Sequence, residues 1–497
     1  MVKRLKLKEK FNDFREMPII QKCNFLAFLF LWLFVIDVSF FGGGKYVTVF
    51  SITPRMFFAV LALFLSIPKL IKNLKTLIKN PIVIFFLIFL LWIIICAIRG
   101  YVAGNRIDVL LSDVKGYMWL FLLAVFFANV DSLEKLGIIF NCVLIGATGL
   151  SIFVLLINLL CVLAPSTIGF LYNLLLDSAI GHLGVVSPEI IRIFVSSSPF
   201  VFLAISVAVF RQLKNKKISA WYTTVAVLGV YTIFVTFTRS LYGGLALALM
   251  STAALAVLVY FDRIKVIIKV CIVTVLIFCV SIFVLQFTLS GNYLPFAISR
   301  TFGVQVSNSL AVELRESVDE IFDKETTGGG SGSSSDQGSS SSNIAINNYL
   351  GRTEVSDDVR RQTVYELKEL IKQNPIFGNG LGASAASRET GLDEYFYLNT
   401  IARIGFVGLT MYMLPLGYVV ILTIKKRKTL IFNPETCAAY SGFAGLLLST
   451  YFNPWLNAVL GITIYLLVCV SFNIVKDKEK EGQSSKEISQ QVKEEKE

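Results

Sequence analysis

Three short stretches of the sequence carry charged residues whose types and spacing could do chemistry. FVTFTRSLYGG contains Arg239 where one apolar run ends and the next begins, with almost no loop between them. RRQTVYELKELIKQNPIFGNGLG contains Arg361 and Tyr365, which lie one helical turn apart. LDEYFYLNTIARIGFVGL contains Glu394 just before another apolar run. A planar guanidinium group binds phosphate through paired hydrogen bonds, so the arginines predict an anionic partner, with phosphate the most natural one.

The composition predicts that these stretches belong to a membrane protein. The chain has 497 residues, of which 55% are hydrophobic and 16% are charged, whereas about 25% of residues are charged in a typical soluble domain. Continuously apolar runs of roughly 17–25 residues, the length that crosses a bilayer as a helix, recur about twelve times. The sequence therefore predicts an all-α polytopic helical bundle with about 12 transmembrane helices rather than a barrel of alternating strands. The runs lie near residues 24–41, 52–71, 82–98, 109–128, 136–163, 190–210, 218–237, 241–260, 265–289, 396–422, 436–452 and 455–474.

Lysine and arginine gather in every second connection, which predicts the orientation of the bundle. The clusters lie at 69–79, 211–217, 263–269 and 425–428, and the N-terminal stretch MVKRLKLKEK belongs to the same set. Cytoplasmic loops carry this excess, so we expect both termini in the cytoplasm and no nucleic acid among the partners, although the formal net charge is +12. The eight cysteines lie in or beside apolar runs without a CxxC pair, and neither a metal nor a cofactor is expected.

The predicted divisions of the chain follow the apolar runs. We expect a cytoplasmic N-terminal segment, a block of transmembrane helices, a large extracytoplasmic loop, a second block of transmembrane helices and a disordered cytoplasmic tail. A glycine/serine tract in the loop has too few apolar residues to fold, and a charged amphipathic helix follows it. The five segments comprise residues 1–22, 23–289, 290–395, 396–475 and 476–497, with the tract at 326–342 and the amphipathic helix at 356–373.

The amphipathic helix is expected to begin at Ser356, a typical N-cap residue that two aspartates follow. Val364, Leu367 and Ile371 form its apolar face, and Pro375 ends it. The GNGLG run beyond the proline does not fit a dinucleotide loop, because such a loop follows a strand and precedes a helix. We expect its glycines to supply positive φ angles or close backbone approach.

Each candidate residue also has a simpler structural interpretation. Arg239 could be an anchor whose charged head reaches the membrane boundary, although the charge pattern places it on the outer side, where positive charge is disfavoured. Glu394 could be a solvated acid at the start of a helix. His182, the only histidine, lies in the other long outer connection, near residues 164–189, and no role is predicted for it.

The three stretches together resemble those of the O-antigen ligase and O-antigen polymerase family of bacterial membrane glycosyltransferases. The family has T-x-S-R at an outer helix end, and residues 236–239 read T-F-T-R here. It has an arginine, a tryptophan four residues later and then an N-P-hydrophobic-hydrophobic-G-x-G-x-G turn. This chain has Arg361, Tyr365 and the turn at 374–382. The order and spacing agree across the region 230–410.

The third motif contains the main departure from the family. The family has a histidine, a leucine four residues later and then A-E-x-G-x-x-G. This chain has Glu394, Leu398 and A-R-I-G-F-V-G at 402–408. In ligase-type members the histidine resembles a general base on the acceptor hydroxyl. The glutamate in its place favours a polymerase of lipid-linked repeat units over a ligase.

The resemblance implies a transfer reaction on the outer face of the bacterial cytoplasmic membrane. Donor and acceptor would be oligosaccharides on undecaprenyl pyrophosphate, joined with inversion and without a metal. Arg239 and Arg361 would hold the leaving pyrophosphate, and Glu394 would take the proton of the attacking hydroxyl. Membrane lipid, a flippase and a chain-length regulator are the other partners that the resemblance implies. Further contacts with the substrates are expected from Tyr365, Thr238, Lys115, Arg192 and Arg403.

Two other functions stay open on the sequence. A ligase or oligosaccharyltransferase would attach finished glycan to lipid A–core or to protein, and the sequence does not name the acceptor. A lipid-linked glycan flippase or secondary transporter would also have about twelve helices, but we expect its charges along a central cavity between two related halves. Here the unusual charges gather at one outer face beside a long loop.

Overall fold

A bundle of helices forms almost the whole of the described structure. The computed structural model describes residues 17–45, 52–187, 190–260, scattered positions between 265 and 279, 352–386, 394–425 and 433–494. Within these residues, eight helices are long and apolar enough to cross a membrane, and the only sheet is a two-stranded antiparallel hairpin. The prediction of an all-α multi-pass membrane protein is confirmed at that level. The count of twelve crossings and the orientation stay predictions.

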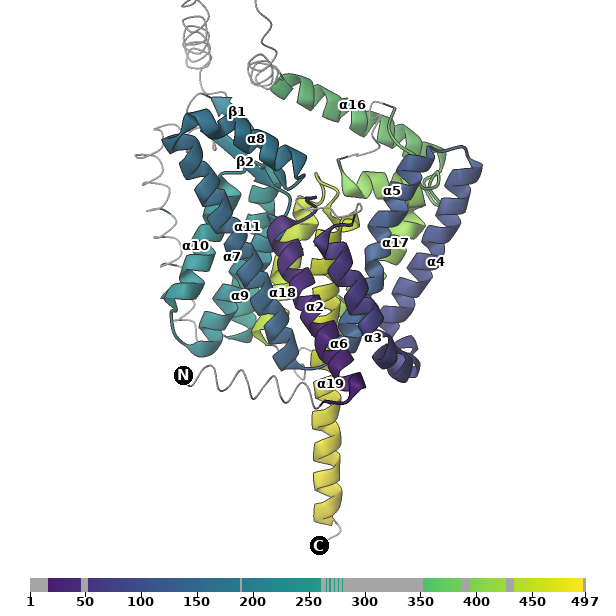
Figure 1. Cartoon of the computed structure of the whole chain (residues 1–497). Helices are drawn as coiled ribbons and strands as arrows, with labels where there is room; N and C mark the ends of the chain where they lie inside the picture. The colour runs from purple at the N-terminus through teal and green to yellow at the C-terminus, as the bar shows by residue number, and fades with distance from the viewer. Residues whose placement is uncertain are drawn as a thin grey trace, which may run out of the picture.

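The apolar runs of the sequence become helices that run up and down the bundle (Figure 1). The eight long apolar segments are α2 (Ile19–Phe41), α3 (Pro54–Ile78), α4 (Pro81–Val102), α5 and α6 together (Ile107–Met118 and Leu122–Asn129), α7 (Leu133–Leu163), α11 (Arg239–Val259), α17 (Phe396–Lys425) and the first half of α19 (Val459–Glu494). The others are α8 (Ile168–Asp177), α9 (Pro199–Asn215), α10 (Ala220–Phe234), α16 (Arg352–Gln373), α18 (Pro434–Ser449) and the 3₁₀ turns η1 (Trp119–Phe121), η2 (Pro165–Thr167) and η4 (Trp455–Asn457).

Two of the predicted runs differ from the structure in their interiors. The run at 190–210 begins as strand β2 (Ile190–Val195), which pairs with β1 (Gly181–Ser187), and its helix starts only at Pro199. Branched residues at alternate positions favour the strand, and proline is well tolerated in the first turn of the helix. The run at 109–128 is interrupted by η1 between α5 and α6. The run at 265–289 lies largely outside the described residues.

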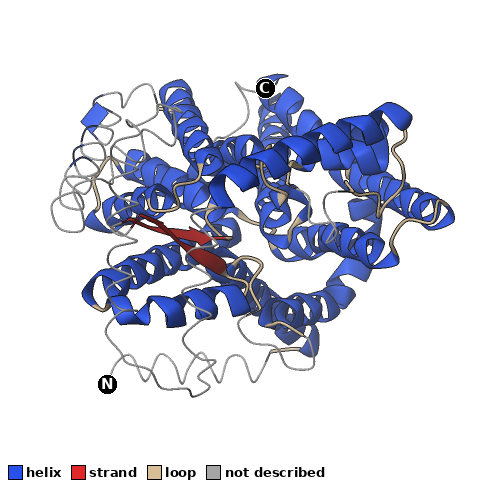
Figure 2. Cartoon of the chain, turned by 90° about the horizontal axis from the view of Figure 1, so that it is seen from above, coloured by secondary structure: helices blue, strands red, loops and turns tan. Residues whose placement is uncertain are grey.

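One end of the bundle carries all the elements that hold the candidate residues. Helix α16 lies across this end, together with α8 and the β1–β2 hairpin, while α19 extends at the opposite end (Figure 1). Seen from above, the two strands lie across the helix ends (Figure 2). We call this the α16 end. Since α10 finishes and α11, α17 and α19 begin here, the turns between helices bring distant parts of the sequence together.

The core of the bundle is built around the apolar half of α19. Of the residues in the span Val459–Lys476, 89% are buried inside the protein. The buried share is only 17% in the apolar 18-residue segment of α3 and 28% in that of α4. Close packing of small residues joins α11 to α18: a Cβ on Gly244 would lie 2.8 Å from the carbonyl oxygen of Gly445. Small residues allow helix backbones to approach in membranes. This packing fixes the start of α11 beside the end of α18.

The predicted amphipathic helix exists, with a different beginning. Helix α16 starts at Arg352 rather than at Ser356, so Ser356 lies within the helix and is not its N-cap. Its end at Gln373 matches the prediction, two residues before Pro375. Of the apolar face, Leu367 is fully buried and Ile371 packs beside it against α17. Residues 280–351, which include the glycine/serine tract, lie outside the described residues.

The tail that was predicted to be disordered from residue 476 is helical. Helix α19 continues to Glu494, and Figure 1 shows it projecting from the bundle as a single rod. Lysine, glutamate and glutamine, which dominate this stretch, are all good helix formers, and a polar segment can extend a helix that the core has already nucleated. The prediction of disorder gave too much weight to the high polarity of the tail.

Candidate functional site

The turn between α10 and α11 holds the first candidate residues. Arg192 of β2 donates from Nε to the carbonyl oxygen of Thr236 at 2.8 Å and from a terminal nitrogen to Oγ1 of Thr238 at 3.1 Å. The strand also donates from Ile193 N to the carbonyl oxygen of Val235 at 3.0 Å. The turn is tight, with Phe237 buried at a φ of 44°. Arg192 and Thr238 therefore hold the turn in place.

Arg239 occupies the first position of α11, directly after this turn, and its side chain is exposed. The N-terminus of a helix carries partial positive charge and unpaired N–H groups. An exposed guanidinium at that point adds a full positive charge to the same place. The turn thus presents a cation and a helix end to anything that reaches the α16 end of the bundle.

His182 has a structural role in the β1–β2 hairpin. Its ring stacks on Phe194 with the centroids 4.9 Å apart. Burial, with a smaller effect from the charge of Arg192, lowers the pKa of His182 to about 4. The guanidinium of Arg192 lies over the ring of Phe194, 5.9 Å from its centroid. The neutral imidazole is one layer in a stack that positions Arg192.

Glu394 lies just before α17 and pairs with α16. Nε of Arg360 is 2.6 Å from Oε2 of Glu394, and a terminal nitrogen is 3.4 Å from Oε1. Both side chains are partly exposed, 42% for the arginine and 31% for the glutamate. The sequence pointed to Arg361, but successive residues on a helix point about 100° apart. Arg361 is an exposed neighbour on the same helix, and the exposed Tyr365 lies one turn further along.

A chain of contacts connects Glu394 with Arg239 across the α16 end. Tyr395, held at a φ of 70°, has its ring 6.2 Å from that of Phe452 in the turn after α18. The next residue of this turn, Asn453, donates from Nδ2 to Oγ of Ser240 at 2.9 Å. Ser240 directly follows Arg239. A cation, an aromatic surface and a carboxylate therefore lie along one path at this end of the protein.

The aromatic part of that path is open to the surroundings. Tyr451 and Phe452 are 47% and 45% exposed. Tyr451 lies edge-on to Tyr395, with centroids 6.3 Å apart, and Tyr397 anchors the group by donating to the carbonyl oxygen of Leu447 at 2.9 Å. Exposed aromatic rings next to a carboxylate provide flat apolar faces together with a polar group. This combination suits a ligand with apolar faces and hydroxyl edges.

The GNGLG turn performs the structural role that its glycines predicted. Helix α17 has a kink at Gly405, whose φ is 73°, and the turn after α16 fits into it. Asn379 N and Gly380 N donate to the carbonyl oxygens of Ala402 and Arg403, at 2.8 and 2.9 Å. Phe406 N donates in return to the carbonyl oxygen of Pro375, at 3.0 Å. Gly380, at a φ of 87°, has no room for a Cβ because the backbone of Gly100 in α4 lies against it.

Arg403 and Lys115, two of the expected substrate contacts, differ in their relation to the GNGLG turn. Arg403 is buried, paired with Asp113 of α5 at 2.8 Å, and donates from Nε to the carbonyl oxygen of Ala383 at 2.8 Å. The other oxygen of Asp113 accepts from Gly382 N at 2.9 Å. The Arg403 side chain thus fixes the turn from within. Lys115, two residues after Asp113, is exposed on α5.

Arg360, Asp113 and Asn453 belong to the site through long-range contacts and were not predicted. Arg360 had a usable signal, because it is the other half of the RR pair. Asn453 had none, and spacing could not reveal the partners of Asp113 and Asn453, since their contacts span 290 and 213 residues of sequence. A single acid in an apolar run is a recognised indication of a buried partner, and Asp113 fits it.

A scan against models of known protein families and a search of curated proteins each return no match. Among the residues that the structure describes, no three histidine, cysteine, aspartate or glutamate side chains form a group that could hold a metal ion.

Proposed function

We propose that the protein is a polymerase of lipid-linked oligosaccharide repeat units. It transfers glycan from an undecaprenyl-pyrophosphate donor to a sugar hydroxyl of a second lipid-linked chain, with inversion at the anomeric carbon. In this proposal the α16 end faces the outside of a bacterial cytoplasmic membrane and the chain crosses that membrane twelve times. The observation that carries the proposal is the path from the exposed cation Arg239 through the aromatic group to the Glu394–Arg360 pair.

The cations suit the leaving group of this reaction. When the anomeric C–O bond breaks, its electron pair goes to a pyrophosphate oxygen, and stabilising that developing charge is usually the largest catalytic term. Arg239 and Arg361 are both exposed at the α16 end, where a lipid-linked pyrophosphate would arrive at the membrane boundary. A hydrogen bond to a charged group contributes about 1.5–3 kcal/mol. Each arginine would then account for roughly a ten- to hundredfold rate effect.

The carboxylate suits the attacking hydroxyl. The acceptor oxygen forms the new bond to the anomeric carbon from the face opposite the pyrophosphate, and its proton passes to Glu394 and then to water. General base catalysis of this kind contributes about 10²–10⁴-fold. The pairing with Arg360 holds the carboxylate in one orientation. The exposed rings of Tyr451 and Phe452 contact Tyr395, the residue after Glu394, and would take the apolar face of the acceptor sugar.

The test is the exchange of one carboxylate for its amide. In cells that lack the wild-type copy, Glu394→Gln is expected to abolish chain extension, whereas Glu369→Gln, at a partly exposed glutamate on α16 paired with Lys372, should extend normally. Gel analysis of the surface glycan reads the outcome, and immunoblotting of membranes checks that both variants insert. Long glycan of normal length from Glu394→Gln would remove the residue as the base.

The same gels separate the proposal from a ligase. Deletion of a polymerase leaves products with a single repeat, while deletion of a ligase leaves long chains that are not attached to their acceptor. Orientation is tested by cysteine labelling of Gln362→Cys, at an exposed residue of α16. Labelling by a membrane-impermeant maleimide in intact spheroplasts is expected. Protection there, with labelling only in inverted vesicles, would place the α16 end in the cytoplasm and reject the scheme.

A further inference from the structure

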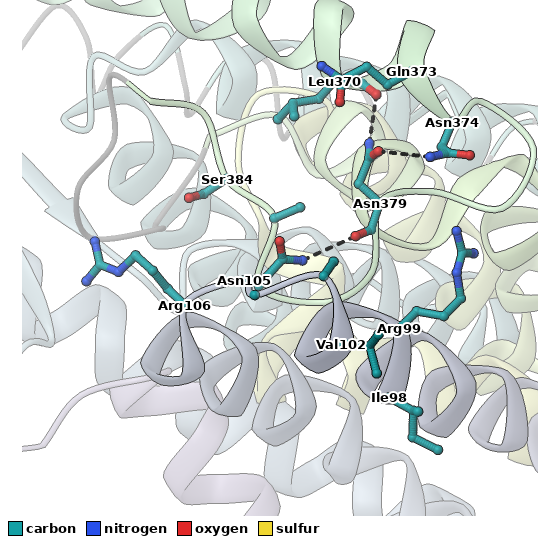
Figure 3. Close-up of a pocket in the computed structure, with 14 residues that line it drawn as sticks. Ile98, Arg99, Val102, Asn105, Arg106, Leu370, Gln373, Asn374, Asn379 and Ser384 are labelled. Carbon is teal, nitrogen blue, oxygen red and sulfur yellow. Dashed lines mark hydrogen bonds between the residues drawn. The ribbon is translucent and has the colours of Figure 1, made fainter.

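A separate cleft opens at the α16 end, away from the path between Arg239 and Glu394. It lies between the last turn of α4, the loop after it, the end of α16 and the turn that follows α16 (Figure 3). Its volume is about 720 Å³, within the range of roughly 300–1,000 Å³ that small-molecule sites have. None of the residues assigned above to transfer lines it. The cleft is large enough to hold a ligand of its own.

The two cations of this cleft are already engaged by the protein. The terminal nitrogens of Arg99 donate to the carbonyl oxygens of Phe377 and Gly378, both at 2.8 Å. Arg106 pairs with Asp108 at 2.6 Å. Figure 3 shows the two guanidinium groups on opposite sides, with the amides of Asn105 and Asn379 between them. Because phosphate recognition relies on a guanidinium fork aimed at the ligand, this arrangement argues against an anionic ligand.

The groups that remain for a ligand are neutral hydrogen-bonding groups. Nδ2 of Asn105 donates to the carbonyl oxygens of Asn379 and Leu381, at 3.2 and 3.0 Å, which leaves its amide oxygen as an acceptor. The side chains of Gln373 and Ser384, also in the lining, make no hydrogen bond to any described residue. An amide offers both donors and acceptors, and a hydroxyl offers both on one atom. Such groups match the hydroxyls of sugars.

Aliphatic side chains line the cleft from both of its helices. Ile98 and Val102 of α4 are 59% and 78% exposed, and Leu370 of α16 adds an aliphatic side chain on the other side, near Gln373 (Figure 3). A mainly apolar wall with a few convergent polar groups is the usual composition of a small-molecule site. A sugar ring has the matching pair of surfaces, with C–H groups on its faces and hydroxyls at its edge.

We propose that this cleft binds uncharged sugar units of a lipid-linked glycan at a distance from the reacting bond. Helix α16 connects the two sites: Arg360 contacts Glu394, and Gln373 lines the cleft. Thirteen residues of helix span about 20 Å, so one chain of several sugars can occupy both. Resting on the proposed function, the cleft retains the growing glycan between additions.

Binding is tested on the full-length protein in lipid nanodiscs. The probes are a panel of neutral oligosaccharides of two to eight hexose or N-acetylhexosamine units, and inorganic pyrophosphate as the anionic alternative. The double variant Gln373→Ala/Ser384→Ala should weaken binding of the best neutral probe at least tenfold. Gln362→Ala, at an exposed glutamine of the same helix outside the cleft, should leave it unchanged. Equal binding by the double variant and wild type, or no binding by any neutral probe, would overturn the proposal.

Chain length in cells gives a second readout that is independent of the base. Val102→Trp, which places a large ring in the cleft, should shift the product to shorter chains while single additions continue. Tyr101→Trp, at the neighbouring exposed residue outside the lining, should give wild-type lengths. Unchanged lengths from Val102→Trp would reject retention by the cleft. If instead the cleft binds sugar while Glu394→Gln still extends chains, the proposed base fails and the cleft stands.

Discussion

Two tight turns at the α16 end are built in opposite ways. The turn after α16 is fixed from within, by the buried pair of Arg403 with Asp113 and by glycines that fit against α4 and the kink of α17. The turn between α10 and α11 is fixed from outside, by the partly buried Arg192 of the hairpin. The turn after α16 is therefore a rigid framework. The turn between α10 and α11, which the hairpin holds from one side, presents the exposed Arg239.

The largest expected effect breaks the framework turn. Gly380→Ala should prevent stable folding, since the residue has a φ of 87° and its new Cβ would overlap the backbone of Gly100. Gly417→Ala, in the same region of sequence with open space around it, should fold normally. The fraction of monodisperse protein after detergent extraction measures the difference. Equal yields from the two variants would show that the turn is not closely packed.

The next effect compares the two arginines that hold the turns. Arg403→Ala leaves Asp113 buried without its partner and is expected to cost about 3–5 kcal/mol in free energy of unfolding. Arg192→Ala removes hydrogen bonds at a partly exposed site and should cost about 1–3 kcal/mol. Titration with denaturing detergent measures both. The double variant Asp113→Asn/Arg403→Met should recover part of the larger loss, because no unpaired charge remains.

A third prediction separates activity from stability at the turn between α10 and α11. Arg239→Ala should lower the rate of chain extension about ten- to hundredfold and leave unfolding within about 0.5 kcal/mol of wild type, as for an exposed position. Extension by purified protein, with a lipid-linked repeat as substrate, measures the rate. A variant that unfolds readily but extends at the normal rate would assign Arg239 to structure alone.

The smallest effect concerns the pH dependence of the hairpin. The folded-state pKa of His182, about 4, lies below its ordinary value of 6.5, so protonation favours the unfolded chain. Its neutral form gives full stability above pH 6.5, and that contribution is lost progressively as the pH falls towards 4. His182→Phe, which keeps the stack on Phe194, should lose less stability across this range. Thermal unfolding at pH 7 and pH 4.5 measures the difference between the two proteins.

The sequence predicted the helices well because membrane spans are encoded locally. Apolar length alone located α2, α4, α7, α11 and α17, and the glycine spacing predicted the unusual backbone of the turn after α16. The prediction was wrong where the same local pattern fits two kinds of secondary structure. The strand at 190–195 was absorbed into an apolar run, and the first half of a buried helix looks the same in sequence as a buried strand.

The candidate site could be predicted only in part, because its residues are paired through space. Arg239 and Glu394 were singled out by their position at the ends of apolar runs, and both lie at the α16 end. The choice between Arg360 and Arg361 depends on the rotation of α16 relative to α17, which one sequence does not contain. Arg403 looked like a ligand contact because it lies near a predicted outer helix end, and only its distant partner Asp113 reveals that it is buried in an ion pair.

The kink of α17 has a consequence for how the protein is made. Carbonyl groups of Ala402 and Arg403 receive hydrogen bonds from residues 379 and 380, and an unsatisfied backbone group in hydrocarbon costs several kcal/mol. Helix α17 is thus incomplete as an independent insertion unit. Residues 375–380 are synthesised before residues 396–425. The segment that completes α17 is therefore already present when α17 leaves the ribosome and enters the membrane.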